Sequence, residues 1–130
     1  MNRPRVLLAD DHPFLLKAAG SLLSHCCDVV GTASTGVTLV SEAIRLCPDV
    51  IVTDIAMPNL NGIDAVHQLR DAGSRARVIF LTIHSEEEFV NACMAEGEGY
   101  VHKSRMQEHL IPAVQAALNG ESYISRFNST

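Results

Sequence analysis

Short runs of apolar residues rich in β-branched side chains recur five times along the chain, at 6–9, 29–33, 50–53, 78–82 and 99–101. Each run is continuously apolar rather than alternating, which is typical of strands buried on both faces of a sheet. The intervals between the runs are too long for hairpins and suit crossover connections that carry a helix. The pattern therefore predicts five parallel strands joined by helices.

The segments between these runs carry apolar residues at helical spacing. Gly73, Gly97 and Gly120 stand where three of the helices are expected to end. Pro112 falls inside the last helix, if that helix begins near Met106, and is expected to kink it. The fold class that follows is α/β, a doubly wound (βα)5 flavodoxin-like domain with a five-stranded parallel sheet and helices on both faces.

Composition narrows the class of protein. A chain of 130 residues, of which 47% are hydrophobic, fits one domain with a substantial core. The net charge of −5 argues against a nucleic-acid-binding surface on this chain. No signal peptide is expected at the start, and no apolar run reaches the roughly 18 residues of a membrane helix. The four cysteines lack metal-binding spacing, so we expect reduced thiols and a cytoplasmic protein.

Polar residues stand where the predicted strands end, and they decide the chemistry. Asp10 and Asp11 follow the first run, Asp54 the third and Lys103 the fifth, while Thr82 closes the fourth. Sites of open parallel sheets lie outside the carboxyl ends of the strands, so we expect these side chains in one pocket. Three neighbouring carboxylates repel one another and favour a bound cation, for which all-oxygen ligands suit Mg²⁺. A carboxylate beside a divalent ion and an ammonium group is suited to accept a phosphoryl group.

Four segments carry a family resemblance: VLLADDHP from residue 6, DVIVTDIAMPNLNG from 49, VIFLT from 78 and GYVHK from 99. Together they resemble bacterial response-regulator receiver domains of two-component systems, over residues 5–122. The branch is similar to the NarL/FixJ type, which is usually fused to a C-terminal helix-turn-helix DNA-binding domain. The resemblance implies a receiver domain at 1–122, with 123–130 as a tail or the start of a linker to an output domain that this chain does not contain.

The resemblance also implies roles for the acidic residues. Asp54 would be the phosphoacceptor, and a sensor histidine kinase would supply the phosphoryl group. Mg²⁺ would be held by Asp10, Asp11, Asp54 and the backbone carbonyl of Ala56. Gly62, in the turn after the third strand, is expected to adopt a conformation that other residues resist.

The remaining implied roles concern the switch. Thr82 and Lys103 would bind the phosphoryl group, and Tyr100 would turn inward as Thr82 moves. The resemblance further implies a homodimer on phosphorylation and control of transcription, with DNA bound by the absent domain alone. Catalysis would be limited to the chain's own phosphorylation and slow dephosphorylation. Two dimer surfaces stay open: the first helix with the fifth, or the fourth helix with the fifth strand and helix.

Other functions fit the pattern less well. An aspartyl phosphatase needs a second acid two residues after its nucleophile, where this chain has Ala56. A flavodoxin-like FMN carrier needs a Ser/Thr-rich phosphate loop after the first strand, where the two aspartates would repel the phosphate. A phosphorylation-independent interaction module is the mildest alternative, but the complete set of acidic residues with Thr82 and Lys103 makes it unnecessary. One further possibility is kept, a transition-metal site that includes His12, His84 or His102, since imidazole favours such ions.

Overall fold

The computed structural model describes residues 3–126, in which strands and helices alternate along the chain. The strands are β1 (Arg5–Ala9), β2 (Asp28–Ala33), β3 (Val50–Thr53), β4 (Arg77–Thr82), β5 (Gly99–His102) and β6 (Tyr123–Ser125). The α-helices are α1 (Pro13–Leu23), α2 (Gly36–Leu46), α3 (Gly62–Asp71), α4 (Glu87–Glu96) and α5 (Met106–Leu118), with a short 3-10 turn at Lys103–Arg105.

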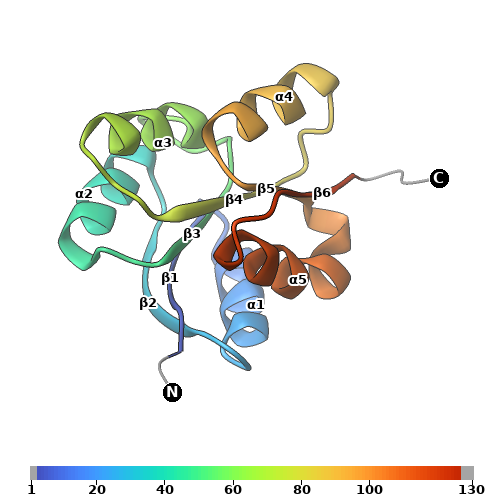
Figure 1. Cartoon of the computed structure of the whole chain (residues 1–130). Coiled ribbons are helices and arrows are strands. Elements are labelled where there is room, and N and C mark those ends of the chain that lie inside the picture. The colour runs from blue at the N-terminus through green and yellow to red at the C-terminus, as the bar shows by residue number, and fades with distance from the viewer. Residues whose placement is uncertain (1–2, 127–130) are drawn as a thin grey trace.

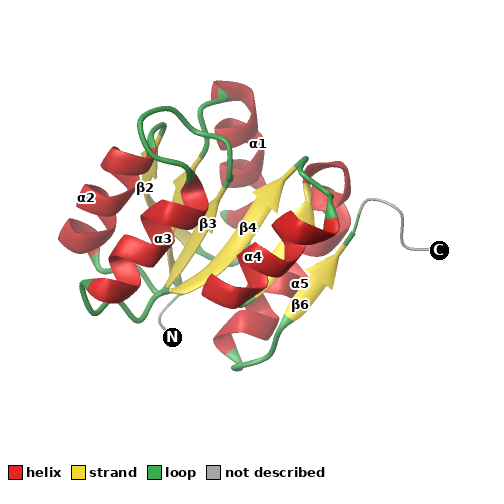
Figure 2. Cartoon of the chain, turned by 90° about the horizontal axis from the view of Figure 1, so that it is seen from above, coloured by secondary structure: helices red, strands yellow, loops and turns green. Residues whose placement is uncertain are grey.

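The strands form one parallel sheet in the order β2-β1-β3-β4-β5-β6. Helices cover both faces of it (Figures 1 and 2). One core cluster joins the sheet to α2, α3 and α4, and a second joins it to α1 and α5. The interior strands β1, β3 and β4 are almost wholly buried, as continuous apolar runs require. The predicted α/β flavodoxin-like class with a parallel sheet is confirmed.

The prediction of five strands is wrong, because residues 3–126 form six. Tyr123–Ser125 pair in parallel with β5 and add β6 at the edge of the sheet. Tyr123 and Ile124 favour strands, but two such residues in a polar segment are too few to predict one, and their pairing depends on the β5 edge that only the fold provides. The expected tail at 123–130 thus begins as a strand, while its last part, 127–130, lies outside the described residues.

The last helix begins at Met106, as expected, and continues through Pro112 to Leu118. Pro112 has no N–H to donate to the carbonyl of Glu108. Both Pro112 and Glu108 are exposed, so water can hydrate the carbonyl that loses its partner. The proline therefore lies within the helix without ending it.

The glycines predicted to end helices are confirmed. Gly73 and Gly120 follow α3 and α5 with φ of 90° and 80°, the left-handed region that favours glycine. Gly97 is the C-cap of α4.

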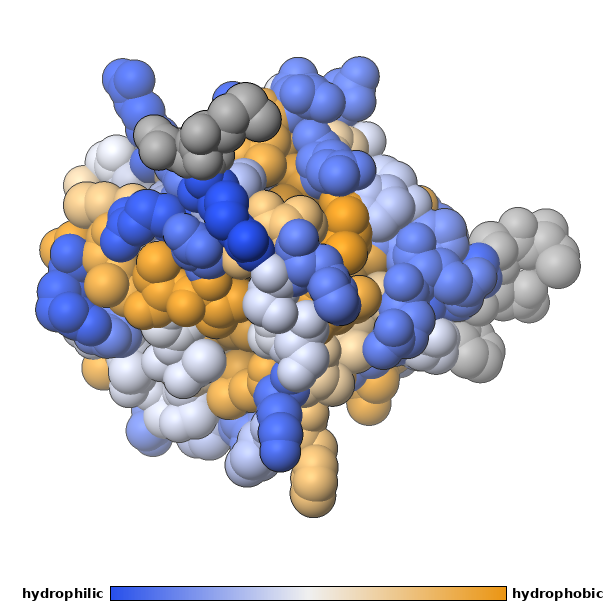
Figure 3. Space-filling model, turned by 90° about the horizontal axis from the view of Figure 1, so that it is seen from below, coloured by the Kyte–Doolittle hydropathy of each residue, from blue (hydrophilic) through white to orange (hydrophobic). Residues whose placement is uncertain are grey.

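Figure 3 shows the face of the molecule that points downward in Figure 1. On this face, hydrophilic side chains divide the hydrophobic surface into patches. Among the described residues, six large apolar side chains are exposed to solvent: Phe14, Val37, Ile44, Ile83, Leu118 and Ile124. Within residues 3–126, none of the helices has the length and apolar character needed to span a bilayer.

Candidate functional site

The carboxyl ends of β1, β3 and β5 bring together two carboxylates and an ammonium group. Lys103 Nζ lies 2.9 Å from Asp10 Oδ2 and 2.8 Å from Asp54 Oδ2. Asp10 and Asp54 are buried, at 1% and 3% exposed, and Lys103 is largely covered. Residues separated by more than 40 positions in the chain thus meet because parallel strands end at one edge of the sheet.

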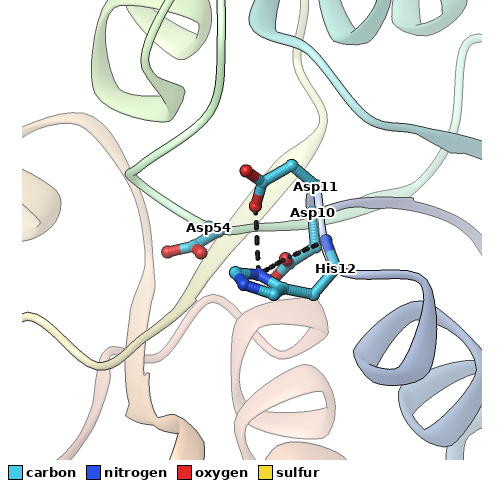
Figure 4. Close-up of side chains that lie close together, drawn as sticks. All are labelled: Asp10, Asp11, His12 and Asp54. Carbon is cyan, nitrogen blue, oxygen red and sulfur yellow. Dashed lines mark hydrogen bonds and ion pairs between the residues drawn. The ribbon is translucent and has the colours of Figure 1, made fainter.

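Four side chains at this edge could hold a metal ion. Asp10, Asp11, His12 and Asp54 each offer one ligand atom, and these atoms all lie within 4.8 Å of one another. Figure 4 shows the first three on the loop after β1 with Asp54 of the loop after β3 beside them. The three carboxylates supply hard oxygen ligands, and Asp11 is open to water. This donor set fits Mg²⁺, which needs few protein ligands and keeps several waters.

Asp54 is fixed by its own backbone and its neighbours. Its amide donates to the Ala9 carbonyl at 2.9 Å, which extends the pairing of β3 with β1 by one residue. Its Oδ1 accepts a 2.6 Å hydrogen bond from the Ile55 amide, while Oδ2 faces Lys103. The buried Thr53 hydroxyl donates to the Asp54 carbonyl at 2.9 Å. One oxygen is therefore held by the main chain and the other is directed into the acidic cluster.

Gly62 permits this arrangement by leaving space. A Cβ added to Gly62 would lie 1.9 Å from the carbonyl oxygen of Asp54. Gly62 is not among the described residues with positive φ, whereas Asn59 in the same loop has φ of 70°. The expectation that Gly62 supplies an unusual conformation is therefore wrong, and close approach of the backbone is the reason for the glycine.

The protonation state of Lys103 is set by two opposing effects. Burial lowers its pKa, but the hydrogen bonds and charges of Asp54 and Asp10 outweigh burial, so that the net pKa is raised. Lys103 is thus a firmly charged ammonium group between two buried carboxylates. It partly offsets the repulsion between them.

Thr82 and Tyr100 both hold His84, which follows β4. Thr82 Oγ1 accepts a 3.2 Å hydrogen bond from the His84 amide. The Tyr100 ring is fully buried, and its hydroxyl donates to the His84 carbonyl at 2.6 Å. The His84 ring in turn lies over Phe89 of α4, with centroids 5.0 Å apart. Thr82 lies at the predicted sheet edge, Tyr100 points inward, and both bond to the loop that leads into α4.

The three histidines considered as metal ligands have different surroundings. His12 joins the acidic cluster, with Nδ1 at 3.1 Å from Asp10 Oδ1 and 3.0 Å from Asp11 Oδ1. His84 packs on α4, and His102 Nδ1 contacts the Ser104 hydroxyl at 2.8 Å. Among the described residues, the group with metal-ligand geometry includes His12 but neither of the other two.

Two neighbours of the cluster have roles in the structure that the sequence did not indicate. Thr53 reads as one more β-branched strand residue, and its bond to Asp54 depends on the turn after β3. His84 is an ordinary loop histidine until Thr82 and Tyr100 are seen to bond to its backbone. Ala56 lies two residues after Asp54 and is exposed.

A hollow of about 630 Å³ lies at the other end of the sheet, where β4 begins, lined in part by Ile44, Cys47 and Arg77. It is far from the acidic cluster. A second hollow, beside Asp10, has room for only about 10 Å³. Ligand pockets for groups of cofactor size typically enclose about 300–1,000 Å³. The hollow beside Asp10 is therefore too small for a group of cofactor size.

The fold and the acidic cluster together define a class of protein, and comparison with known proteins agrees. Residues 6–115 match the response regulator receiver domain family. The chain belongs to this family, and it is a receiver domain. Receiver domains are phosphoacceptors rather than enzymes that turn over an external substrate, and the family binds Mg²⁺ at an acidic pocket.

Relatives of known name include transcriptional regulators. The chain is 34% identical over 125 residues to the transcriptional regulatory protein MctR of Rhizobium johnstonii, covering 93% of this chain and 58% of that one. It is 35% identical over 123 residues to the nitrate/nitrite response regulator protein NarL of Escherichia coli, covering 92% and 57%. The chain thus spans little more than half the length of these relatives.

Solved structures share the fold over nearly the whole chain. A two-component response regulator of the LuxR family from Aurantimonas has a TM-score of 0.89 at 29% identity, with 95% of this chain and 91% of that one covered. The signal receiver domain of a NarL response regulator from Mycobacterium tuberculosis has a TM-score of 0.87 at 26% identity, with 93% and 100% covered.

Proposed function

We propose that Asp54 is the phosphoacceptor of this receiver domain. The observation that carries the proposal is the position of its carboxylate, which faces the Lys103 ammonium at 2.8 Å within the group formed with Asp10 and Asp11. An oxygen of Asp54 attacks the phosphorus of a phosphohistidine, a new O–P bond forms, and the P–N bond breaks with its electron pair left on the imidazole. The donor is a sensor histidine kinase. A carboxylate oxygen attacks without giving up a proton, so Asp54 needs no general base.

The other site residues stabilise charge. Asp10, Asp11, Asp54 and the backbone carbonyl of Ala56 would hold Mg²⁺, which when bound neutralises the charge that develops on the phosphoryl oxygens. Lys103 leaves one of its two carboxylate contacts and pairs with the phosphoryl group. Its raised pKa keeps it charged throughout the neutral range. Such preplaced charge is the main contribution that a protein makes to phosphoryl transfer.

The switch depends on Thr82. A phosphoryl group adds about −1.5 to −2 charges and strong acceptor oxygens. Moving a population from mostly inactive to mostly active requires about 5.5 kcal/mol of differential interaction. Hydrogen bonds to a charged group contribute about 1.5–3 kcal/mol each, so those of Thr82 and Lys103 together approach that value. Tyr100 is already turned inward in this structure, and it is coupled to Thr82 because both bond to the backbone of His84.

The output is control of transcription. MctR and NarL are named as regulators and extend well beyond the region that this chain matches. We propose that the receiver acts through a C-terminal DNA-binding domain and forms a homodimer on phosphorylation. The net charge of −5 on the receiver agrees with DNA contacts lying elsewhere.

Asp54→Asn tests the proposal directly. Wild-type protein incubated with acetyl phosphate and Mg²⁺ is expected to gain the mass of one phosphoryl group, and the variant to gain none. Omitting Mg²⁺ and adding a chelator should also abolish labelling. Asp71→Asn is the matched control, because Asp71 is 74% exposed and lies on α3 away from the cluster. Equal labelling of wild type and Asp54→Asn would refute the assignment.

A further inference from the structure

The strand β6 lies between the two helices that flank the end of the sheet. Its register places Tyr100 opposite Ile124, and the Tyr123 amide donates to the Glu98 carbonyl at 3.1 Å. Figures 1 and 2 show β6 beside β5, with α4 and α5 on either side. The segment after α5 therefore closes the edge of β5 that would otherwise present unpaired backbone groups.

Two side-chain contacts tie this strand to the helices. Arg126 forms a two-pronged ion pair with Glu87, with Nη1–Oε1 and Nη2–Oε2 distances of 2.8 and 3.2 Å. Glu87 is the first residue of α4. On the other side, Tyr123 Oη lies 2.5 Å from His109 Nδ1 of α5. The strand is thus a cross-link between the start of α4 and the first turn of α5.

The start of α4 is also where the switch residues act. His84 is held through its amide by Thr82 and through its carbonyl by Tyr100, and it stands three residues before Glu87. If the Thr82 hydroxyl turns to the phosphoryl group, the His84 amide loses its acceptor. The loop from His84 to Glu87 then gains freedom, and the geometry of the ion pair with Arg126 cannot be kept without a compensating shift.

We propose that β6 is a switch-sensitive strand: it is docked across α4 and α5 while Thr82 bonds to the His84 amide, and it loosens when Thr82 turns to a phosphoryl group on Asp54. The inference rests on the proposed function, since it needs that phosphoryl group. Residues 123–126 then have a signalling role in addition to any role as a linker to a following domain. They transmit the state of Asp54 to whatever follows them in the chain, and while docked they keep the β5 edge closed to a second copy.

Amide hydrogen exchange of residues 123–125 tests the coupling in the whole chain. Beryllofluoride with Mg²⁺, which imitates the phosphoryl group, is expected to speed exchange severalfold in wild type and to leave Asp54→Asn unchanged. Arg126→Gln should exchange about two- to fivefold faster without beryllofluoride, the range that the loss of one exposed ion pair gives. Arg75→Gln, an exposed arginine at the other end of the sheet, is the control and should match wild type.

Swapping the two charged residues shows whether the ion pair itself slows the amide hydrogen exchange. The double variant Glu87→Arg with Arg126→Glu should return slow exchange, because the pair re-forms with its charges reversed. Unchanged or slower exchange with beryllofluoride, in protein whose Asp54 accepts label from acetyl phosphate, would overturn the coupling and leave the proposed function intact. Failure of Asp54 to take label would instead refute the proposed function, and this inference with it.

Discussion

At the scale of single residues, the position of Asp54 depends on residue 62 being a glycine, which has no Cβ to collide with the Asp54 backbone. The loop after β3 turns back so closely that the Gly62 amide bonds to the Ile55 carbonyl at 2.8 Å. At the same place the Asp54 carbonyl would meet any Cβ at 1.9 Å. Asp54 is held on one side by strand pairing and on the other by this turn, so its carboxylate has little freedom to leave the cluster.

Gly62→Ala is therefore expected to lower the free energy of unfolding by about 1–3 kcal/mol, the usual result of forcing an extra group into a packed region. It should also slow labelling of Asp54 by acetyl phosphate, because the backbone of Asp54 must shift. Urea unfolding and intact-mass kinetics measure the two effects. Gly20→Ala is the control: its new Cβ would have ordinary contact with Leu8 at 3.7 Å, and alanine favours the helix by up to about 1 kcal/mol. Equal stability of the two variants would contradict the steric explanation.

At the scale of elements, α5 contains a proline that interrupts its backbone hydrogen bonding. Pro112 removes one hydrogen bond from a helix that packs Leu110, Ala113 and Val114 into the core. The buried face of the helix compensates, because its apolar contacts do not involve the exposed proline ring. The defect is thus confined to the solvent side of α5.

Pro112→Ala should raise the free energy of unfolding by about 1–2 kcal/mol. The gain of a hydrogen bond and of helix propensity outweighs the entropy that alanine returns to the unfolded chain. Urea unfolding gives the value. Gln115→Ala, on the exposed side of the same helix, should change stability by less than about 0.5 kcal/mol. A destabilised Pro112→Ala would show that the proline ring makes stabilising contacts in the folded helix.

At the scale of the whole molecule, three buried groups keep their protons in the folded state, and they make the free energy of unfolding depend on pH in the alkaline range. Burial raises the pKa of Cys93 from its ordinary 9.0 to about 12. Burial and the adjacent Cys26 thiol raise the pKa of Cys27 from 9.0 to about 12, and burial raises that of Tyr100 from 10.0 to about 12. In the unfolded chain these groups ionise near their ordinary values. Between about pH 9 and 12 the unfolded state therefore binds fewer protons than the folded state.

The stability that these groups contribute is fully present below about pH 9 and is lost as the pH rises toward 12. The free energy of unfolding in urea should thus fall between about pH 9 and about pH 10.5. Cys93→Ala removes one of the three groups and should give a shallower fall over the same interval, whatever its stability at neutral pH. A free energy that is constant over this range would contradict the assignment.

Much of this molecule follows from local patterns in the sequence. Strands buried on both faces leave continuous apolar runs, and a parallel sheet carries the residues after them to one edge, so the meeting of Asp10, Asp54 and Lys103 was predictable. Contacts that depend on the folded neighbourhood were not. Glu98 adds a charge beside β5 in the sequence, yet in the structure it accepts from the Val78 amide at 2.7 Å and lies 3.3 Å from Arg70. Similarly, β6 has no pattern of its own, and the close approach at Gly62 requires the turn to be seen.

The sixth strand has a practical consequence for anyone who trims this protein. A fragment cut at residue 115, where the family match ends, would lose the last part of α5 together with β6. The β5 edge would then be bare, because Tyr100 and Val101 would lose their partners in β6 and keep only those in β4. Open sheet edges recruit other chains, so such a fragment is prone to self-association through an edge that β6 covers in the longer chain. A dimer seen with the shortened protein would then reflect the cut rather than the signalling state.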